Sequence, residues 1–133
     1  MDKEKIISFF NSLASSWDEH QERDEEVIST ILDIAEVRAG CSVLDVACGT
    51  GILIGDYLER DAASVTGIDI SSEMIRVAEN KYPDVSFICD DAQCCSFDKS
   101  FDTIMIYNAF PHFNCPDKLF SNLTSYQIGR AHV

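Results

Sequence analysis

The residues best suited to chemistry lie in the stretch VLDVACGTG, from Val43 to Gly51. In this stretch an apolar run ends in a carboxylate, and a glycine-spaced turn follows. Gly49 and Gly51 lack a β-carbon, so the backbone can turn tightly and a ligand can lie directly against it. The pattern predicts a strand running into a loop that cradles a nucleotide. It is not the Gly-x-Gly-x-x-Gly dinucleotide fingerprint, because Ala47 takes a first-glycine position and the residues where the last glycine should fall are Ile52, Leu53 and Ile54.

Polar residues also follow the later apolar runs of the chain. Asp69 lies about 20 residues beyond the glycine turn, the distance at which an acid at a strand end meets ribose hydroxyls. Asp91 could accept a hydrogen bond from an adenine amino group, with the backbone amide of Ala92 beside it. Ile70 and Met74 could flank the adenine ring. Because ligands in an open parallel sheet bind beyond the carboxyl ends of the strands, these residues predict one nucleotide site.

The elements that must position these residues alternate between strands and helices. Apolar residues recur at helical spacing over residues 3–13 and 24–37, with the acidic segment SSWDEHQERDEE read as a polar connector. The remaining patterns predict strands over 42–47, 64–69, 85–89 and 101–107, and helices over 52–60 and from the N-cap Ser71 to Pro83. We therefore expect an α/β fold with a Rossmann-like, doubly wound parallel sheet and N-terminal helices.

Composition and charge exclude several classes of function. The chain has 133 residues, of which 46% are hydrophobic, so one domain with a real core is expected. Its net charge of −13 argues against binding to nucleic acid or an anionic membrane surface, but is compatible with a nucleotide that has a cationic centre. Neither a signal peptide nor an apolar run of about 18 residues is present, so we expect a cytoplasmic protein.

Four motifs in order carry a resemblance to a known family: VLDVACGTG, VTGIDIS, FICDDAQ and FDTIMIYNAFPHF. Together they resemble the class I S-adenosylmethionine-dependent methyltransferases, and within them the ubiquinone/menaquinone-type small-molecule branch. The resemblance extends from about Phe9 to Tyr126. It implies a cofactor with one ribose and a methionine tail, and a family turn that accepts alanine at the first glycine.

The resemblance also implies a role for individual residues. The methionine part of the cofactor would be surrounded by Asp45, Ala47, Gly49 and Gly51. The ribose and adenine would be bound by Asp69, Ile70, Met74, Asp91 and Ala92. Two more residues would complete the site, namely Asn108 near the sulfonium and Trp17 in an N-terminal lid formed by the segment SLASSWDEH.

The implied reaction is direct displacement, in which a nucleophile attacks the methyl carbon and S-adenosylhomocysteine leaves. The sulfonium is already activated, so the protein mainly aligns donor and acceptor, which can supply roughly 7–11 kcal/mol. A general base is needed only where the nucleophile must lose a proton, and His112 is the candidate at the correct rim. No metal is expected in this reaction, and the sequence does not identify the small-molecule acceptor or the oligomeric state.

Three alternatives stay open at this point. A methyltransferase for a thiophilic metalloid could use Cys89, Cys94, Cys95 and Cys115. A NAD-dependent oxidoreductase is disfavoured by the missing third glycine. A non-catalytic fragment is the third alternative.

The end of the chain leads to the expectation of an incomplete domain. The resemblance implies seven strands, whereas the patterns predict four. We expect N-terminal helices and a lid over residues 1–40, a partial methyltransferase domain over 41–127, and a non-native tail over 128–133. The last seven residues, QIGRAHV, can be encoded by DNA that contains a widely used sequencing-adapter string, from which the tail over 128–133 would come. The 133-residue chain alone is then expected to be poorly soluble or molten, and inactive.

Overall fold

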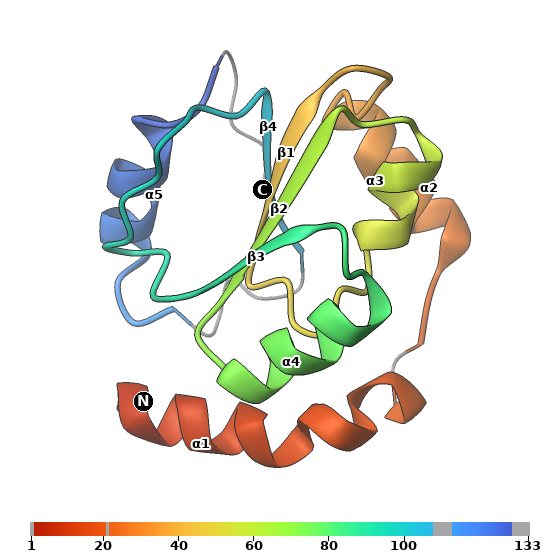
Figure 1. The fold of residues 1–133 in the computed structure, drawn as a ribbon. Helices are drawn as coiled ribbons and strands as arrows, with labels where there is room; N and C mark the ends of the chain where they lie inside the picture. Colours follow the sequence, from red (N-terminus) through yellow and green to blue (C-terminus); the bar gives the residue numbers. More distant parts are fainter. Residues whose placement is uncertain (1, 21, 108–112, 129–133) are drawn as a thin grey trace.

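A four-stranded parallel sheet forms the centre of the molecule in the computed structural model, which describes residues 2–20, 22–107 and 113–128 (Figure 1). The spatial order of the strands is β3-β2-β1-β4. Their bounds are β1 Ser42–Val46, β2 Ser64–Asp69, β3 Ser86–Cys89 and β4 Thr103–Ile106. Because all four strands run in the same direction, their carboxyl ends meet at one edge of the sheet.

Helices cover both faces of this sheet, so the expected doubly wound α/β fold is confirmed. Figure 1 shows α2 and α3 on one side of the strands and α5 on the other. The helices are α1 Lys3–Leu13, α2 Glu25–Ile34, α3 Ile54–Glu59, α4 Ser72–Lys81 and α5 Pro116–Thr124. No helix among the described residues is long and apolar enough to cross a membrane.

Successive side chains of β1 pack alternately into two separate hydrophobic cores. Val43 packs in one buried cluster with residues of α2 and α3, including Leu32 and Tyr57. Leu44 packs in the other cluster, which includes Leu119 of α5. This is the pattern expected of a strand that is buried on both faces, because successive side chains point to opposite sides of a sheet.

Side-chain caps fix where three of the helices begin. The carboxylate of Asp2 accepts a hydrogen bond from the Glu4 amide at the start of α1, and Asp24 accepts one from the Val27 amide at the start of α2. The predicted N-cap Ser71 is confirmed, since its hydroxyl accepts from the Met74 amide. Each cap pairs one backbone amide that would otherwise lack a partner in the first helical turn.

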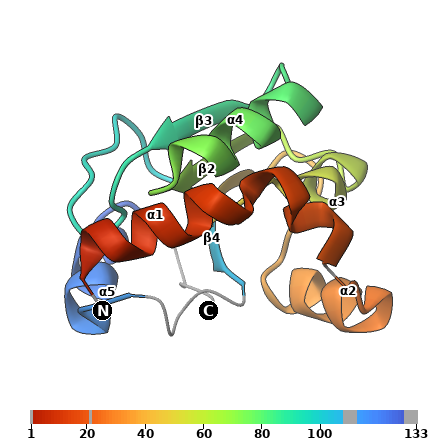
Figure 2. The ribbon, with the colours of Figure 1, turned by 90° about the horizontal axis from the view of Figure 1, so that it is seen from below.

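The N-terminal segment lies across the carboxyl edge of the sheet. Figures 1 and 2 show α1 crossing this edge beside α4. A 3₁₀ helix, Ala14–His20, continues from α1, so the segment read as a polar connector is partly helical. The helix after the glycine turn starts at Ile54, two residues later than expected, and α5 was not expected at all.

Candidate functional site

A cleft of about 180 Å³ opens at the carboxyl edge of the sheet, beneath α1. It receives residues from the ends of β1, β2 and β3 as well as from the N-terminal helices. Nine of the residues predicted from sequence line it: Trp17, Asp45, Ala47, Gly49, Asp69, Ile70, Met74, Asp91 and Ala92. The structure therefore brings together side chains and backbone from four separate parts of the chain, as the parallel topology requires.

The turn after β1 uses the left-handed backbone conformation three times. Ala47, Gly49 and Gly51 have φ angles of 57°, 58° and 88°. Ala47 carries a β-carbon in this region, which is strained relative to glycine. Gly51 does not line the cleft as predicted, because it faces the core, where an added β-carbon would meet Ile54 and Tyr82 at 3.2 and 3.3 Å. The turn therefore presents Gly49, but not Gly51, to the cleft.

Asp69, at the end of β2, is held firmly by the backbone around it. Its Oδ2 accepts a hydrogen bond from the Gly49 amide at 2.8 Å, and its Oδ1 accepts one from the Ser71 amide at 2.9 Å. Burial raises the pKa of Asp69, whereas these hydrogen bonds act to lower it. A carboxylate has about four lone-pair sites, so each oxygen can accept a further hydrogen bond from a ligand in the cleft.

Asp45, at the end of β1, is 3% exposed and also lines the cleft. Burial raises its pKa to about 7, the Tyr57 hydroxyl acts to lower that pKa, and the charge of Asp69 acts to raise it. Near neutral pH this carboxyl group can therefore gain or lose a proton with little change in conditions.

The raised pKa of Asp45 predicts how the Asp45→Asn variant behaves. An aspartate in the unfolded chain has a pKa near 3.9, whereas Asp45 in the folded protein has a pKa of about 7. The folded state therefore binds this proton more tightly than the unfolded state. The resulting contribution to the free energy of unfolding is present at low pH and is lost as the pH rises from about 4 to about 7. Asparagine imitates the protonated form, so denaturant unfolding should find the variant more stable than wild type at pH 8, by up to about 4 kcal/mol. The two proteins should be nearly equal at pH 4, and equal stability at both pH values would contradict the assignment.

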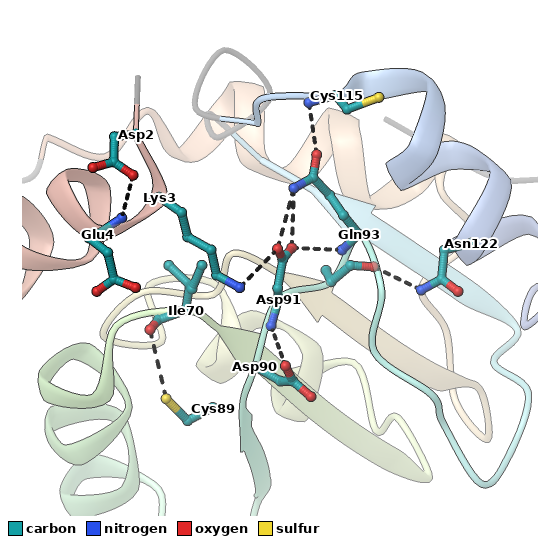
Figure 3. Close-up of polar contacts among 11 residues, drawn as sticks. Asp2, Lys3, Glu4, Ile70, Cys89, Asp90, Asp91, Gln93, Cys115 and Asn122 are labelled. Atoms are coloured by element: carbon teal, nitrogen blue, oxygen red, sulfur yellow. Dashed lines mark hydrogen bonds and ion pairs between the residues drawn. The ribbon is translucent and has the colours of Figure 1, made fainter.

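Asp91, after β3, is the centre of a polar cluster that joins three parts of the chain (Figure 3). Its Oδ1 accepts from the amide of Gln93 at 2.9 Å, and its Oδ2 lies 3.5 Å from Nζ of Lys3 in α1. Gln93 in turn accepts a hydrogen bond from the Cys115 amide at the start of α5. The carboxylate predicted to bind adenine is thus already paired with Gln93 and with a lysine from the segment that covers the cleft.

Comparison with known proteins places the chain in a family. The model of the methyltransferase domain family matches residues 43–126, which is more than half of the chain. The chain belongs to the methyltransferase domain family. The resemblance expected from the four motifs is confirmed at this level.

Relatives of this methyltransferase domain include the ubiquinone/menaquinone biosynthesis C-methyltransferase UbiE of Campylobacter jejuni, 32% identical over 109 residues. The alignment covers 68% of this chain and 45% of that protein, so the chain spans about half the length of the curated relatives it matches. Among solved structures, magnesium protoporphyrin IX methyltransferase from Synechocystis with bound SAM has a TM-score of 0.77 at 19% identity, covering 98% of this chain and 74% of that chain.

A second similar structure shows that this fold alone does not fix the reaction. The [4+2]-cyclase SpnF also has a TM-score of 0.77, at 18% identity, and the match covers 92% of this chain and 55% of that chain. Related folds support different chemistries, so the reaction has to be argued from the site.

Besides the Lys3–Asp91 ion pair, further polar contacts of Asn11 and Asp18 hold the N-terminal segment over the cleft. Oδ1 of Asn11 accepts a hydrogen bond from the Ser71 hydroxyl at the start of α4. Asp18 accepts one from Thr50 in the glycine turn and forms an ion pair with Lys81 at 2.9 Å. Trp17 precedes Asp18 in the chain, and its Nε1 lies 3.9 Å from the position that a β-carbon on Gly49 would take. Trp17 therefore lies beside the glycine turn, and its role in a lid over the cofactor stays a prediction.

Two predicted site residues, Asn108 and His112, lie outside the described residues. The cysteines considered for a metalloid are described, and all are free thiols. Cys89, Cys94, Cys95 and Cys115 are absent from the cleft lining, which instead contains Cys48. No group of three or more His, Cys, Asp or Glu side chains within the described part of the chain is arranged to hold a metal ion.

Sequence reasoning missed several residues of the cleft wall. Lys3, Ile6 and Phe10 line it from one face of α1. Their spacing of three and four residues is the signal that they share a face, although it does not say what that face covers. Gln93 and Tyr107 also line the cleft. Gln93 is the last residue of the motif FICDDAQ, and Tyr107 lies in the motif FDTIMIYNAFPHF, directly after β4.

Proposed function

We propose that the protein carrying this chain transfers the methyl group of S-adenosylmethionine to a small molecule. The observation that carries the proposal is Asp69, whose two carboxylate oxygens are each oriented by one backbone amide at the cleft. A carboxylate held in this way suits two adjacent ribose hydroxyls, since each oxygen keeps accepting capacity. Membership of the methyltransferase domain family supports the same cofactor.

The charges of the cleft fit this cofactor better than a dinucleotide. The charged side chains in its described lining are four carboxylates, from Asp45, Asp69, Asp90 and Asp91, and one lysine, Lys3. Such a site attracts a ligand with sulfonium and ammonium charges, whereas it repels the pyrophosphate of NAD. This charge balance therefore disfavours the oxidoreductase alternative.

Each part of the cofactor has a proposed set of partners in the cleft. Asp45, Ala47 and Gly49 would hold the methionine part, and Asp69 the ribose. The adenine would lie between Ile70 and Met74, with Asp91 and Ala92 at its edge. Asn108 stays a prediction for the sulfonium end. The cofactor supplies a methyl group on a good leaving group, so this chain's residues mainly orient it and exclude water.

The N-terminal helices are proposed to close the site during the reaction. Phe10 and Trp17 line the cleft together, with ring centroids 5.8 Å apart. These rings would shield the reacting methyl group from water, which limits competing hydrolysis. His112 stays a prediction as the base for acceptors that must lose a proton.

The acceptor is proposed to be a small molecule, with quinone-type compounds tested first because the Campylobacter jejuni relative is named for such biosynthesis. A metalloid acceptor is the less supported choice, since the four cysteines considered for it are outside the described cleft lining.

We propose the cytoplasm as the site of the reaction, since the six cysteines are all free.

Lys3→Gln tests whether Asp91 is available to adenine. Lys3 pairs with the carboxylate that the adenine amino group would use, so its removal should tighten S-adenosylmethionine binding about 2- to 3-fold at low salt. The gain should shrink at 0.5 M salt because the ion pair is screened. Lys5→Gln is the matched control on α1, since Lys5 has no ion pair among the described residues. Calorimetry that finds weaker binding in Lys3→Gln, or equal effects of both variants, would contradict this role for Asp91.

The function itself is tested by a methyl-transfer assay on the purified protein. S-adenosylmethionine labelled in the methyl group is incubated with a panel of quinone, phenol, amine and thiol acceptors and with arsenite, and labelled products are identified by mass spectrometry. We expect a labelled organic product and S-adenosylhomocysteine in equal amounts. Binding of NADH in preference to S-adenosylmethionine, or labelling of arsenic alone, would replace the proposal with one of the two alternatives.

A further inference from the structure

Tyr57 is a buried polar residue that the proposed function leaves without a role. It lies in α3, is 0% exposed, and belongs to the core cluster on the α2 and α3 side of the sheet. Its hydroxyl is one of two buried side-chain polar atoms that lack a hydrogen-bond partner of good geometry among the described residues. A buried hydroxyl without a partner destabilises the fold, so an aromatic core position would favour phenylalanine unless the hydroxyl has a function.

The register of β1 places Asp45 on the face of the sheet against which Tyr57 packs. Val43 and Asp45 lie on the same face of the strand, because side chains alternate. Val43 packs in the cluster that contains Tyr57, whereas Asp45 stands at the end of the strand and lines the cleft. Tyr57 and Asp45 interact with each other, since each affects the pKa of the other. The hydroxyl is therefore a close neighbour of a carboxylate of the proposed cofactor site.

The other groups around Asp45 offer no counter-charge. Among the described residues, the titratable groups that face it are Tyr57 from α3, Asp69 from the end of β2 and Cys48 from the following turn. Burial and the neighbouring carboxylates raise the pKa of the Cys48 thiol, so it stays neutral. Asp69 repels a second negative charge. The Cys48 thiol is a weak donor and already donates to the Gly49 carbonyl at 3.7 Å. Of these three groups, Tyr57 alone has an O–H without a partner that can donate a hydrogen bond to an ionised Asp45 and lower the cost of its charge.

We propose that Tyr57 is a positioning residue, whose hydroxyl donates a hydrogen bond to the Asp45 carboxylate when the cationic methionine end of the cofactor is bound. The inference rests on the proposed function, since it requires a cationic ligand in this cleft. A positive ligand group favours the ionised carboxylate. The hydroxyl fixes that carboxylate and leaves its other lone pairs to the ligand. Without the hydroxyl, the carboxylate would hold its proton to higher pH, and the ligand would have to displace it.

The Tyr57→Phe variant of the whole protein tests this role through the pH dependence of binding. Calorimetry should measure S-adenosylmethionine affinity from pH 6 to pH 8.5. We expect the variant to bind about 3- to 10-fold more weakly than wild type at pH 6, because its Asp45 stays protonated in more of the free protein. The two affinities should converge at pH 8.5, where Asp45 is ionised in both proteins.

Two controls separate this role from a structural one. Tyr82→Phe removes a hydroxyl from a tyrosine that packs against the same core and lies outside the cleft lining, and it should leave the pH profile unchanged. Thermal unfolding should show that Tyr57→Phe is folded, and carbon-13 NMR titration of Asp45 should give a higher pKa in the variant. Identical pH profiles for wild type and Tyr57→Phe would overturn the inference while leaving the proposed function intact. Absence of S-adenosylmethionine binding to wild type at every pH would overturn the proposed function and this inference with it.

Discussion

Gly49→Val is expected to reduce S-adenosylmethionine binding by more than about 100-fold. Gly49 lines the cleft, with Nε1 of Trp17 3.9 Å from the position of an added β-carbon. A branched side chain would project into this space, where the methionine part of the cofactor is proposed to lie. The backbone has a φ of 58°, so valine also distorts the turn whose amide holds Asp69. Calorimetric titration of wild type and variant measures the loss.

Gly40→Val provides a matched control for backbone strain. Gly40 also has a left-handed backbone, with a φ of 83°, and nothing lies within 4 Å of an added β-carbon. It precedes β1 and lies outside the cleft lining. Valine there should lower the unfolding free energy by about 1–2 kcal/mol without changing affinity. If both variants lose affinity equally, strain alone accounts for the effect and Gly49 is not a contact of the cofactor.

Asp69→Ala is expected to weaken S-adenosylmethionine binding by about 1–3 kcal/mol, because buried ribose hydroxyls lose their acceptor. The change also removes the acceptor of the Gly49 and Ser71 amides, so the glycine turn loses one of its supports. Calorimetry with S-adenosylmethionine and with a 2′-deoxy analogue separates the two effects. Wild type should prefer the ribose form, and the variant should bind both forms equally.

Asp102→Ala is the control for removing a carboxylate that holds a backbone amide. Asp102 accepts from the Ser42 amide at 2.9 Å at the amino end of β1, away from the cleft. Its loss should lower stability and leave cofactor affinity unchanged. Unchanged affinity in Asp69→Ala would remove Asp69 from the site.

Local patterns were sufficient to predict the strand ends of this site. Asp69 closes an apolar run, and Ser71 stands where a helix must begin, so both follow from short-range physical rules. The bounds of β2 match the prediction, and those of β1 differ by one residue. These segments are buried on both faces, so their sequences are continuously apolar and easy to distinguish from the helices.

Contacts between distant segments could not be predicted in this way. The helical spacing of Ile6 and Phe10 predicts an apolar face of α1, but the cleft beneath that face is built from strand ends far along the chain. The Lys3–Asp91 pair has the same origin. Tyr57 reads as a core position of its helix, and its closeness to Asp45 depends on how α3 packs on β1. The start of α5 had a usable signal, since Pro116 at a first helical position precedes the spaced leucines Leu119 and Leu123.

The central claim is that the cleft binds S-adenosylmethionine with its ribose on Asp69. A crystal structure of the protein with S-adenosylhomocysteine tests it most directly. The account predicts that the 2′- and 3′-hydroxyls donate hydrogen bonds to the two carboxylate oxygens of Asp69, at about 2.5–3.0 Å. It also predicts that the adenine lies between Ile70 and Met74. A ligand bound elsewhere, or bound in the cleft with its ribose away from Asp69, would contradict the account.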